Sequence, residues 1–346
     1  MFYQFDAAIE GAAILGVIRA DRGIGAVAVS LEPEGGIIDR TRGSRDMLDD
    51  TGAERAAGTA LGPSSPHRQR LVHVWLLRAF LRGQVIWDRL VPLETVKSWI
   101  KLAPFMARVG IIRPVWVQLE LGVKILLDPS DLLSHCILTS SESVWQPWVW
   151  EALSSGLGDG SVVLDVGAHI GYFTLKSGVR VGQRGRVVAF EPNPGSLETL
   201  RANVAASHAA NVTIVPVACT DRGTTLTLYD AFPRHNSGGA SLSRANAGER
   251  SQGVPVCGRP IDDVLRELGI QWVDAMKVDV EGAELYALQG ATETLLRSHP
   301  KIVIEVQPDA LAGMNTTVEE LFSFLKQVGY TRGRQIGPED WEWTAE

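Results

Sequence analysis

The sequence predicts an α/β protein built on a parallel sheet. Two segments carry this prediction, VVLDVGAHIGYF at residues 162–173 and VVAFEPNP at residues 187–194. Together they have the pattern of a buried strand, a glycine-bearing turn, a helix and a second buried strand that ends in an acid. That order builds a nucleoside pocket at the carboxyl ends of the strands of α/β sheets. Further short apolar runs at residues 213–217, 273–279 and 302–306 are typical of strands buried on both faces.

The first turn favours a cationic nucleoside ligand. Gly167 and Gly171 lack a Cβ, so the backbone can bend sharply and let a ligand approach. Glu191 follows Asp165 by 26 positions (191 − 165), near the roughly 20 residues at which such folds place an acid for ribose hydroxyls. An ordinary strand-to-helix turn, with Glu191 merely capping the next helix, is the alternative.

The residue between the two glycines argues against a dinucleotide. The fingerprint G-x-G-x-x-G needs a glycine where this chain has His169, whose side chain would obstruct a pyrophosphate. The Asp165 carboxylate would also repel phosphates, whereas it suits the sulfonium and amino groups of S-adenosylmethionine. The turn therefore favours S-adenosylmethionine over a nicotinamide cofactor, and His169 is a candidate contact to it.

Six segments between residues 109 and 330 resemble the FkbM family of S-adenosylmethionine-dependent methyltransferases, in the family's order and spacing. They are VVLDVGAHIGYF, GRVVAFEPNP, NVTIVPVACTD, NSGGASL, MKVDVEGAELYALQGA and IVIEVQP. The resemblance implies a class I (Rossmann-like) seven-stranded methyltransferase fold and O-methylation of a hydroxyl on a sugar or another natural product. One departure is visible, because the family usually carries asparagine where this chain has His169.

Composition and charge are those of a soluble globular protein. The chain has 346 residues, 45% hydrophobic and 21% charged, with a net charge of −7. This mild acidity argues against nucleic acid as a partner, which requires a dense basic face. The three widely separated cysteines fit neither a zinc site nor a disulfide framework, so we expect a reducing compartment, the cytoplasm. Residues 71–91 carry too many charges for a transmembrane helix, and we expect no membrane span.

We divide the chain into three parts. Residues 1–67 are rich in Gly, Ala, Asp and Arg without sustained periodicity, and we expect them to be disordered or poorly structured. Helical periodicity over residues 68–110 predicts a helical extension. Residues 111–346 form the predicted methyltransferase domain, which begins with a hairpin (VWVQLEL, Gly122, VKILLDP).

Three further elements are predicted within this domain. Residues 144–153, with three tryptophans, should form a helix over the cofactor site. The insertion at residues 223–258 holds three strand-like pieces, TTLTLYD, GASLSR and VPVCG, which we expect to add an antiparallel sheet beside the active site. The segments GYTRGRQIG and DWEWTAE resemble the closing antiparallel pair of the methyltransferase fold.

The predicted catalytic residues follow the fourth core strand. Lys277, Asp279 and Glu281 lie on one face if the extended geometry continues that far, and ionisable groups at the end of an apolar strand are costly unless paired or used. Asp279 is the first candidate for general base or acceptor anchor, and Glu281 the second. The alternative is a structural ion pair of Lys277 with Asp279 or Asp165, with Glu281 capping a helix that begins at Ala283.

The remaining candidates are less specific. Asn193 could hold the ribose or fix its turn. Ala218 and Asp221 follow the third strand, where the adenine should lie. His235, Asn236 and the loop at 237–241 could fold over the acceptor. Asp279 and Glu305 could hold a divalent cation, which we do not favour because the sequence shows no third oxygen ligand.

The predicted function is therefore S-adenosylmethionine-dependent O-methylation of a small-molecule or glycan acceptor. A nicotinamide-dependent oxidoreductase is the first alternative, disfavoured by His169 and the missing third glycine. A non-catalytic binding module on a methyltransferase fold is the second, against which Asp279 and Glu281 argue.

Overall fold

The computed structural model describes residues 9–10, 13–20, 23–30, 113–139, 145–231 and 236–345. The chain divides into two compact units, Met1–Pro63 and Ser64–Glu346. In the first unit β1 (Ile9–Glu10), β2 (Ala13–Ala20) and β3 (Gly23–Ser30) form an antiparallel sheet. These strands are what the structure describes of the segment 1–67. The predicted helical extension 68–110 lies outside the described residues, so the domain boundaries stay predictions.

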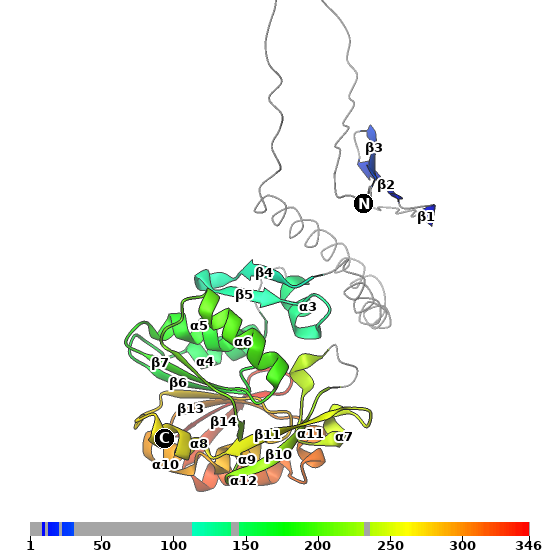
Figure 1. Ribbon diagram of the computed structural model, residues 1–346. Coiled ribbons are helices and arrows are strands. Elements are labelled where there is room, and N and C mark those ends of the chain that lie inside the picture. Colours follow the sequence, from blue (N-terminus) through cyan, green and yellow to red (C-terminus); the bar gives the residue numbers. More distant parts are fainter. Residues whose placement is uncertain are drawn as a thin grey trace, which may run out of the picture. The chain divides into compact units, whose positions relative to one another are not determined.

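The second unit is built on a seven-stranded sheet (Figure 1) in the order β14-β15-β13-β12-β6-β7-β8. Neighbours from β13 to β8 are parallel, and β15 is antiparallel to both β13 and β14. This is the topology of the class I methyltransferase fold, and the predicted fold class is confirmed. The strands are β6 (Val162–Val166), β7 (Arg186–Phe190), β8 (Val212–Val215), β12 (Ala275–Val278), β13 (Lys301–Glu305), β14 (Tyr330–Gln335) and β15 (Asp340–Ala345).

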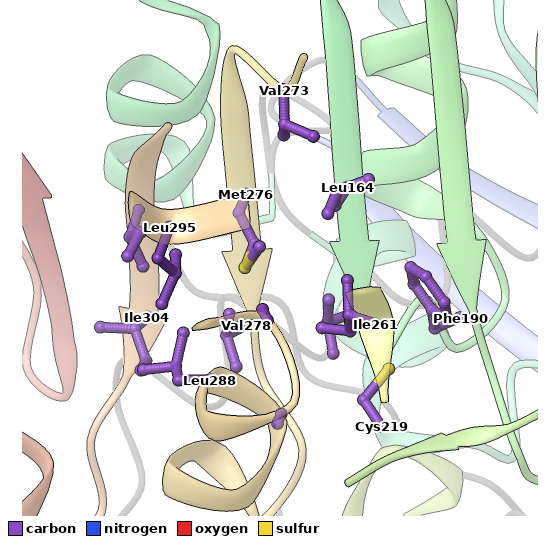
Figure 2. Packing of buried hydrophobic residues seen from close by; sticks show 14 of the residues in the cluster. Leu164, Phe190, Cys219, Ile261, Val273, Met276, Val278, Leu288, Leu295 and Ile304 are labelled. Atoms are coloured by element: carbon purple, nitrogen blue, oxygen red, sulfur yellow. The ribbon is translucent and has the colours of Figure 1, made fainter. Parts of the chain in front are cut away.

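Strand alternation separates the core into two layers. Leu164, Met276 and Ile304 pack on one face of the sheet (Figure 2) against helices that include α8 and α9. Their chain neighbours Val163 and Ala275 pack on the other face against α4 and α5. The helices are α4 (Pro147–Ser154), α5 (Tyr172–Val181), α6 (Pro194–Ala206), α8 (Ile261–Glu267), α9 (Glu284–Gln289), α10 (Thr292–Ser298), α11 (Pro308–Gly313) and α12 (Val318–Gln327).

The predicted hairpin is present and is tied to the first turn of the sheet. β4 (Val115–Gln118) pairs with β5 (Lys124–Leu127) across the short helix η1 (Glu120–Gly122), and α3 (Leu132–Thr139) follows. The buried Asn203 side chain of α6 accepts from the Leu126 N–H (2.7 Å) and donates to the Ile170 carbonyl (2.7 Å). One amide thus fixes the hairpin relative to the turn after β6.

The insertion differs from its prediction in one piece. β10 (Thr224–Tyr229) and β11 (Gly253–Arg259) pair antiparallel, and β9 (Ala218–Cys219) joins β11 in parallel. The predicted middle strand, GASLSR, is wrong, because only Ser241 pairs, through a single bridge to Tyr229. The Ser241 hydroxyl donates to the Glu281 carbonyl (2.7 Å) instead, which turns the chain toward the loop after β12. The helices η2 (Ser237–Gly239) and α7 (Arg244–Ala247) flank it.

The sequence predicts no helix that spans a membrane. Among the described residues, no helix has the length and apolar character that crossing a bilayer requires.

Candidate functional site

A cavity opens at the carboxyl ends of β6, β7, β12 and β13, where the strand order reverses, the position at which open α/β sheets bind ligands. It holds about 1220 Å³ of empty space, its open mouth included. Eight of the predicted residues line it: Gly167, His169, Glu191, Ala218, Lys277, Asp279, Glu281 and Glu305. Asn236 of the predicted loop also lines it, whereas His235 lies outside the described residues.

Gly167 allows the turn after β6 to approach the chain after β12 closely. Its φ is +85°, and an added Cβ would stand 1.8 Å from the Asp279 carbonyl oxygen. Only glycine tolerates both the backbone angle and that approach. Gly171 does not line the cavity; a Cβ there would meet Leu200 of α6 at 2.6 Å, so its role is helix packing.

Glu191 is held by backbone donors. Its Oε2 accepts from the His169 N–H (2.7 Å) and its Oε1 from the Asn193 N–H (2.8 Å). A carboxylate has further lone pairs, which leaves acceptor capacity for ligand hydroxyls. Burial raises the pKa of Glu191 to about 7. Asn193 does not line the cavity; its side chain caps α6 by accepting from the Gly195 N–H (2.9 Å) and donates to Asp230 (3.0 Å).

Asp165 lies behind the cavity wall. It is 1% exposed and is the register partner of Lys277 on the neighbouring strand. The Thr174 hydroxyl donates to its Oδ2 (2.5 Å), and its Oδ1 has no hydrogen-bond partner within the described residues. Burial raises the pKa of Asp165. Its effect on a ligand is therefore through charge, alongside Lys277, without direct contact.

Lys277 and Asp279 form the ion pair that we gave as an alternative. The ammonium lies 2.9 Å from Asp279 Oδ2, and the two side chains are 5% and 29% exposed. Burial alone would lower the pKa of Lys277, but the charges of Asp279 and Asp165 outweigh it and the pKa is raised. Burial alone would raise the pKa of Asp279, but Lys277 lowers it. Both groups are charged at neutral pH.

Glu281 reaches the same cavity by a different backbone path from the one predicted. The extended geometry ends at Val278, and Glu281 has a φ of +52°, followed by Gly282 at +103°. The capping alternative for Glu281 is also wrong, because Glu284 accepts from the N–H groups of Val280 and Gly282, each at 3.1 Å. A left-handed turn at a non-glycine residue is a form of strain that concentrates at functional sites.

Three carboxyl groups crowd one wall of the cavity. Oxygen atoms of Asp279, Glu281 and Glu305 lie within 4.8 Å of one another. Burial, then the charge of Asp279, raises the pKa of Glu281 to about 8 and that of Glu305 to about 10. Glu281 supplies the third oxygen ligand that the sequence did not show, so a divalent cation could fit. Lys277 and the protons on Glu281 and Glu305 already balance most of the negative charge.

His169 is joined to a residue that sequence reasoning missed. Its Nε2 lies 2.6 Å from Ser237 Oγ, and the same hydroxyl lies 2.6 Å from Asp131 Oδ1. Asp131 precedes α3, and its Oδ2 accepts from the Ser134 N–H (3.2 Å). The sequence could have identified Asp131 as a helix cap, but nothing local indicates a contact 106 residues away.

The aromatic segment before β6 contributes its first residues to the cavity. The helix α4 begins at Pro147, and Trp145 and Gln146 line the cavity ahead of it. The Trp145 N–H donates to the Tyr172 hydroxyl (2.9 Å). Asp221, in contrast, is absent from the described residues that line the cavity, and its carboxylate lies 3.5 Å from Arg222 at the surface.

The chain is similar in sequence to a methyltransferase family and to curated relatives. The family described as Methyltransferase FkbM domain matches residues 165–332. The AMB antimetabolite synthetase AmbE of Pseudomonas aeruginosa is 31% identical, over 49% of this chain and 9% of that protein. Methyltransferase sdnD of Sordaria araneosa is 30% identical, over 41% of this chain and 65% of that protein. The chain thus covers less than two thirds of the length of these relatives.

A solved structure carries the same family name. The crystal structure of Methyltransferase FkbM from Methylobacillus flagellatus KT is 21% identical, with a TM-score of 0.40, over 61% of this chain and 52% of that chain. The predicted resemblance to the FkbM family is confirmed by the sequence match over residues 165–332. This part of the chain is similar to the methyltransferase domain of the FkbM family.

Proposed function

We propose that this protein is an S-adenosylmethionine-dependent methyltransferase that methylates a hydroxyl group of a glycan or a secondary metabolite. The observation that carries the proposal is one cavity lined on one side by Gly167, His169 and Glu191 and on the other by Lys277, Asp279 and Glu281. The proposed nucleoside site and a cluster of ionisable groups thus share one space, as a transfer reaction requires.

The residues present fit S-adenosylmethionine. Four carboxyl groups line the cavity beside Lys277, those of Glu191, Asp279, Glu281 and Glu305. A bound sulfonium and ammonium would favour their ionised forms, whereas the phosphates of a dinucleotide would be repelled by them. The His169 side chain also lines the cavity beside the glycine turn, where a pyrophosphate would need free backbone. Glu191 would hold the ribose hydroxyls, the backbone of the glycine turn would lie along the nucleoside, and Ala218 would pack on the adenine.

The acidic wall is suited to a hydroxylated acceptor. When bound, S-adenosylmethionine supplies an electrophilic methyl group to an attacking oxygen. Asp279, charged and fixed by Lys277, can accept a hydrogen bond from the acceptor hydroxyl. Glu281 and Glu305, whose raised pKa values of about 8 and about 10 keep them largely protonated at neutral pH, can donate to neighbouring oxygens. Donors and acceptors side by side match a polyol or sugar better than an isolated phenol.

A methyl-transfer assay tests the proposal. Radiolabelled S-adenosylmethionine is incubated with the full chain over a panel of carbohydrates and metabolites. The wild type should label an acceptor, and Asp279→Ala should lose about a hundredfold or more in kcat while its affinity for S-adenosylmethionine stays within about twofold of the wild type.

A matched control is Asp309→Ala, because Asp309 is an exposed carboxylate in α11 outside the cavity; this variant should act as the wild type. Failure of the wild type to bind S-adenosylmethionine would remove the cofactor from the proposal. Tight binding without transfer to any acceptor of the panel would favour a binding module.

A further inference from the structure

His169, Ser237 and Asp131 form a hydrogen-bonded chain across three elements that are distant in sequence. Asp131 stands before α3, Ser237 lies in η2, and His169 belongs to the turn after β6. The contacts are 2.6 Å from His169 Nε2 to Ser237 Oγ and 2.6 Å from that oxygen to Asp131 Oδ1. The Ser237 N–H also donates to Asp131 Oδ1 (2.8 Å), so the serine is held through its backbone and side chain.

The chemistry of the three groups sets the proton positions. A carboxylate only accepts hydrogen bonds, so the Ser237 hydroxyl donates its proton to Asp131. The Ser237 oxygen can then only accept from His169, which requires the proton of the neutral imidazole to be on Nε2. Burial lowers the pKa of His169 and keeps the ring neutral. The remaining nitrogen, Nδ1, carries a lone pair, and no hydrogen bond to it is present within the described residues.

The carboxyl groups of Asp279, Glu281 and Glu305 are paired or protonated at neutral pH, whereas His169 Nδ1 has a lone pair without a hydrogen bond within the described residues. Asp279 is engaged in the ion pair with Lys277, at 2.9 Å. Glu281 and Glu305 are largely protonated at neutral pH because their pKa values are raised. His169, with a φ of +50°, is also held in a backbone conformation that is rare for a residue with a side chain. Strain of this kind is maintained where the surrounding structure fixes a functional group.

We propose that His169 is the general base of the transfer, with Nδ1 as the accepting atom and with Ser237 and Asp131 as positioning residues. This inference rests on the proposed function. The acceptor oxygen forms a bond to the methyl carbon, the electron pair of the broken carbon–sulfur bond stays on sulfur, and the hydroxyl proton passes to Nδ1. The imidazolium formed is stabilised through Ser237 by the Asp131 carboxylate, and it then returns the proton to solvent.

The charges around His169 are consistent with this role. Asp131 and Asp279 favour its protonated form, and Lys277 disfavours it. The balance keeps the ring neutral before reaction, yet two carboxylates face the positive charge that develops. A base that is neutral at rest and stabilised when charged is what proton abstraction at neutral pH requires.

The tautomer can be measured without an acceptor. Two-bond proton–nitrogen spectra of the full chain, labelled with ¹⁵N-histidine, report which ring nitrogen carries the proton, and the His169 signals are those absent from His169→Asn. The wild type should show the Nε2–H form. Ser237→Ala and Asp131→Asn should show a mixture that includes the Nδ1–H form, and Ser237→Thr, which keeps the hydroxyl, should restore the wild-type spectrum. A wild-type Nδ1–H form, or an unchanged spectrum in Ser237→Ala, would overturn the positioning role.

Turnover tests the base itself. With an acceptor that the wild type methylates, His169→Asn should lose about a hundredfold or more in kcat, with the dissociation constant of S-adenosylmethionine within about threefold of the wild type. Asparagine tolerates the positive φ, so the variant should fold. Unchanged turnover would overturn the base assignment, and so would a large loss of S-adenosylmethionine affinity, which would assign His169 to the cofactor. Absence of transfer by the wild type would overturn the proposed function and the base role with it, whereas the spectra report on the hydrogen-bonded chain in either case.

Discussion

The cavity has two walls, a first wall with Gly167, His169 and Glu191 and a second wall with Lys277, Asp279, Glu281 and Glu305. The two walls hold their carboxyl groups by different means. On the first wall, Glu191 is bound by two backbone N–H groups, of His169 and Asn193. On the second, Asp279 is bound by one ammonium, that of Lys277. Glu281 and Glu305 lie beside it, with carboxylate oxygens within 4.8 Å of one another. On the first wall, the Glu191 carboxyl group accepts hydrogen bonds from backbone N–H groups of the chain around it. On the second wall, the charge of Asp279 is balanced by the side chain of Lys277.

The difference explains where the electrostatic sensitivity lies. Backbone donors are set by the fold and do not change with pH. A buried cluster of acids around a single lysine spreads its pKa values, and removing one member leaves an uncompensated charge. We therefore expect removal of Lys277 on the second wall to act through charge and substitution of Gly167 on the first wall to act through geometry.

The largest effect should come from removing the Lys277 ammonium from the second wall. Lys277→Met leaves Asp165 and Asp279 without their cation, and breaking a buried pair in this way destabilises proteins by about 3–5 kcal/mol. In the wild type, Lys277 lowers the pKa of Asp279 below its ordinary value of 3.8, so the ion pair stays charged at both pH 7 and pH 4. In Lys277→Met, burial without the ammonium should raise the pKa of Asp279, and its protonation as the pH falls toward 4 relieves the buried charge. Denaturant unfolding at pH 7 and at pH 4 should show a larger loss at pH 7. An equal loss at both values would mean that packing, and not charge, determines the effect.

Substitution of Gly167 tests the first wall, where we expect backbone geometry to determine the effect. Gly167→Ala would place a methyl group 1.8 Å from the Asp279 carbonyl oxygen at a φ of +85°, and we expect a loss of about 3 kcal/mol in the free energy of unfolding. Gly158→Ala is the matched control, since a Cβ there meets nothing within 4 Å. Thermal or denaturant unfolding of both variants gives the comparison, and similar stabilities of the two would show that the turn after β6 can relax away from β12.

A smaller effect is expected when the affinities for S-adenosylmethionine and S-adenosylhomocysteine are compared as a function of pH. Glu191 and Glu281 have pKa values raised to about 7 and about 8, so both are mostly neutral at pH 6 and ionised at pH 9. Binding of a cation favours the ionised forms and releases protons, so affinity for S-adenosylmethionine should rise through this window, by about tenfold per pH unit for each proton released. S-adenosylhomocysteine, which lacks the sulfonium charge, should gain less.

The ratio of the two dissociation constants, measured by calorimetry from pH 6 to 9, cancels the titration of the amino acid group that both ligands share. Glu281→Gln should flatten the change in this ratio. A ratio independent of pH in the wild type would indicate that the sulfonium lies away from these carboxyl groups.

The smallest effect concerns a residue that sequence pattern assigned to the cofactor. Asp221 lies at the surface beside Arg222 and does not line the cavity, so Asp221→Ala should change the dissociation constant of S-adenosylmethionine by less than about twofold. A tenfold loss of affinity for S-adenosylmethionine, measured by calorimetry, would show that Asp221 contributes to cofactor binding.

The same contrast separates what the sequence could predict from what it could not. The strands, the glycine turn and Glu191 are local patterns with fixed spacing, and the structure has them close to where they were expected. The middle strand of the insertion was wrong because Ser241 bonds to the loop after β12. Glu281 was placed by alternation, which ends at Val278. Asp131 meets Ser237 only through the tertiary fold, and no local pattern contains that contact.

The central claim is that the first wall binds the cofactor and the second wall binds the acceptor. Its most direct test is calorimetric titration of S-adenosylmethionine into the wild type, Glu191→Ala and Asp279→Ala. We expect Glu191→Ala to weaken binding by about a hundredfold, since it removes a carboxylate from the ribose position together with the partner of two backbone donors. Asp279→Ala should bind within about twofold of the wild type. Undiminished affinity in Glu191→Ala, with both variants folded, would contradict the assignment of the cofactor to the turn after β6.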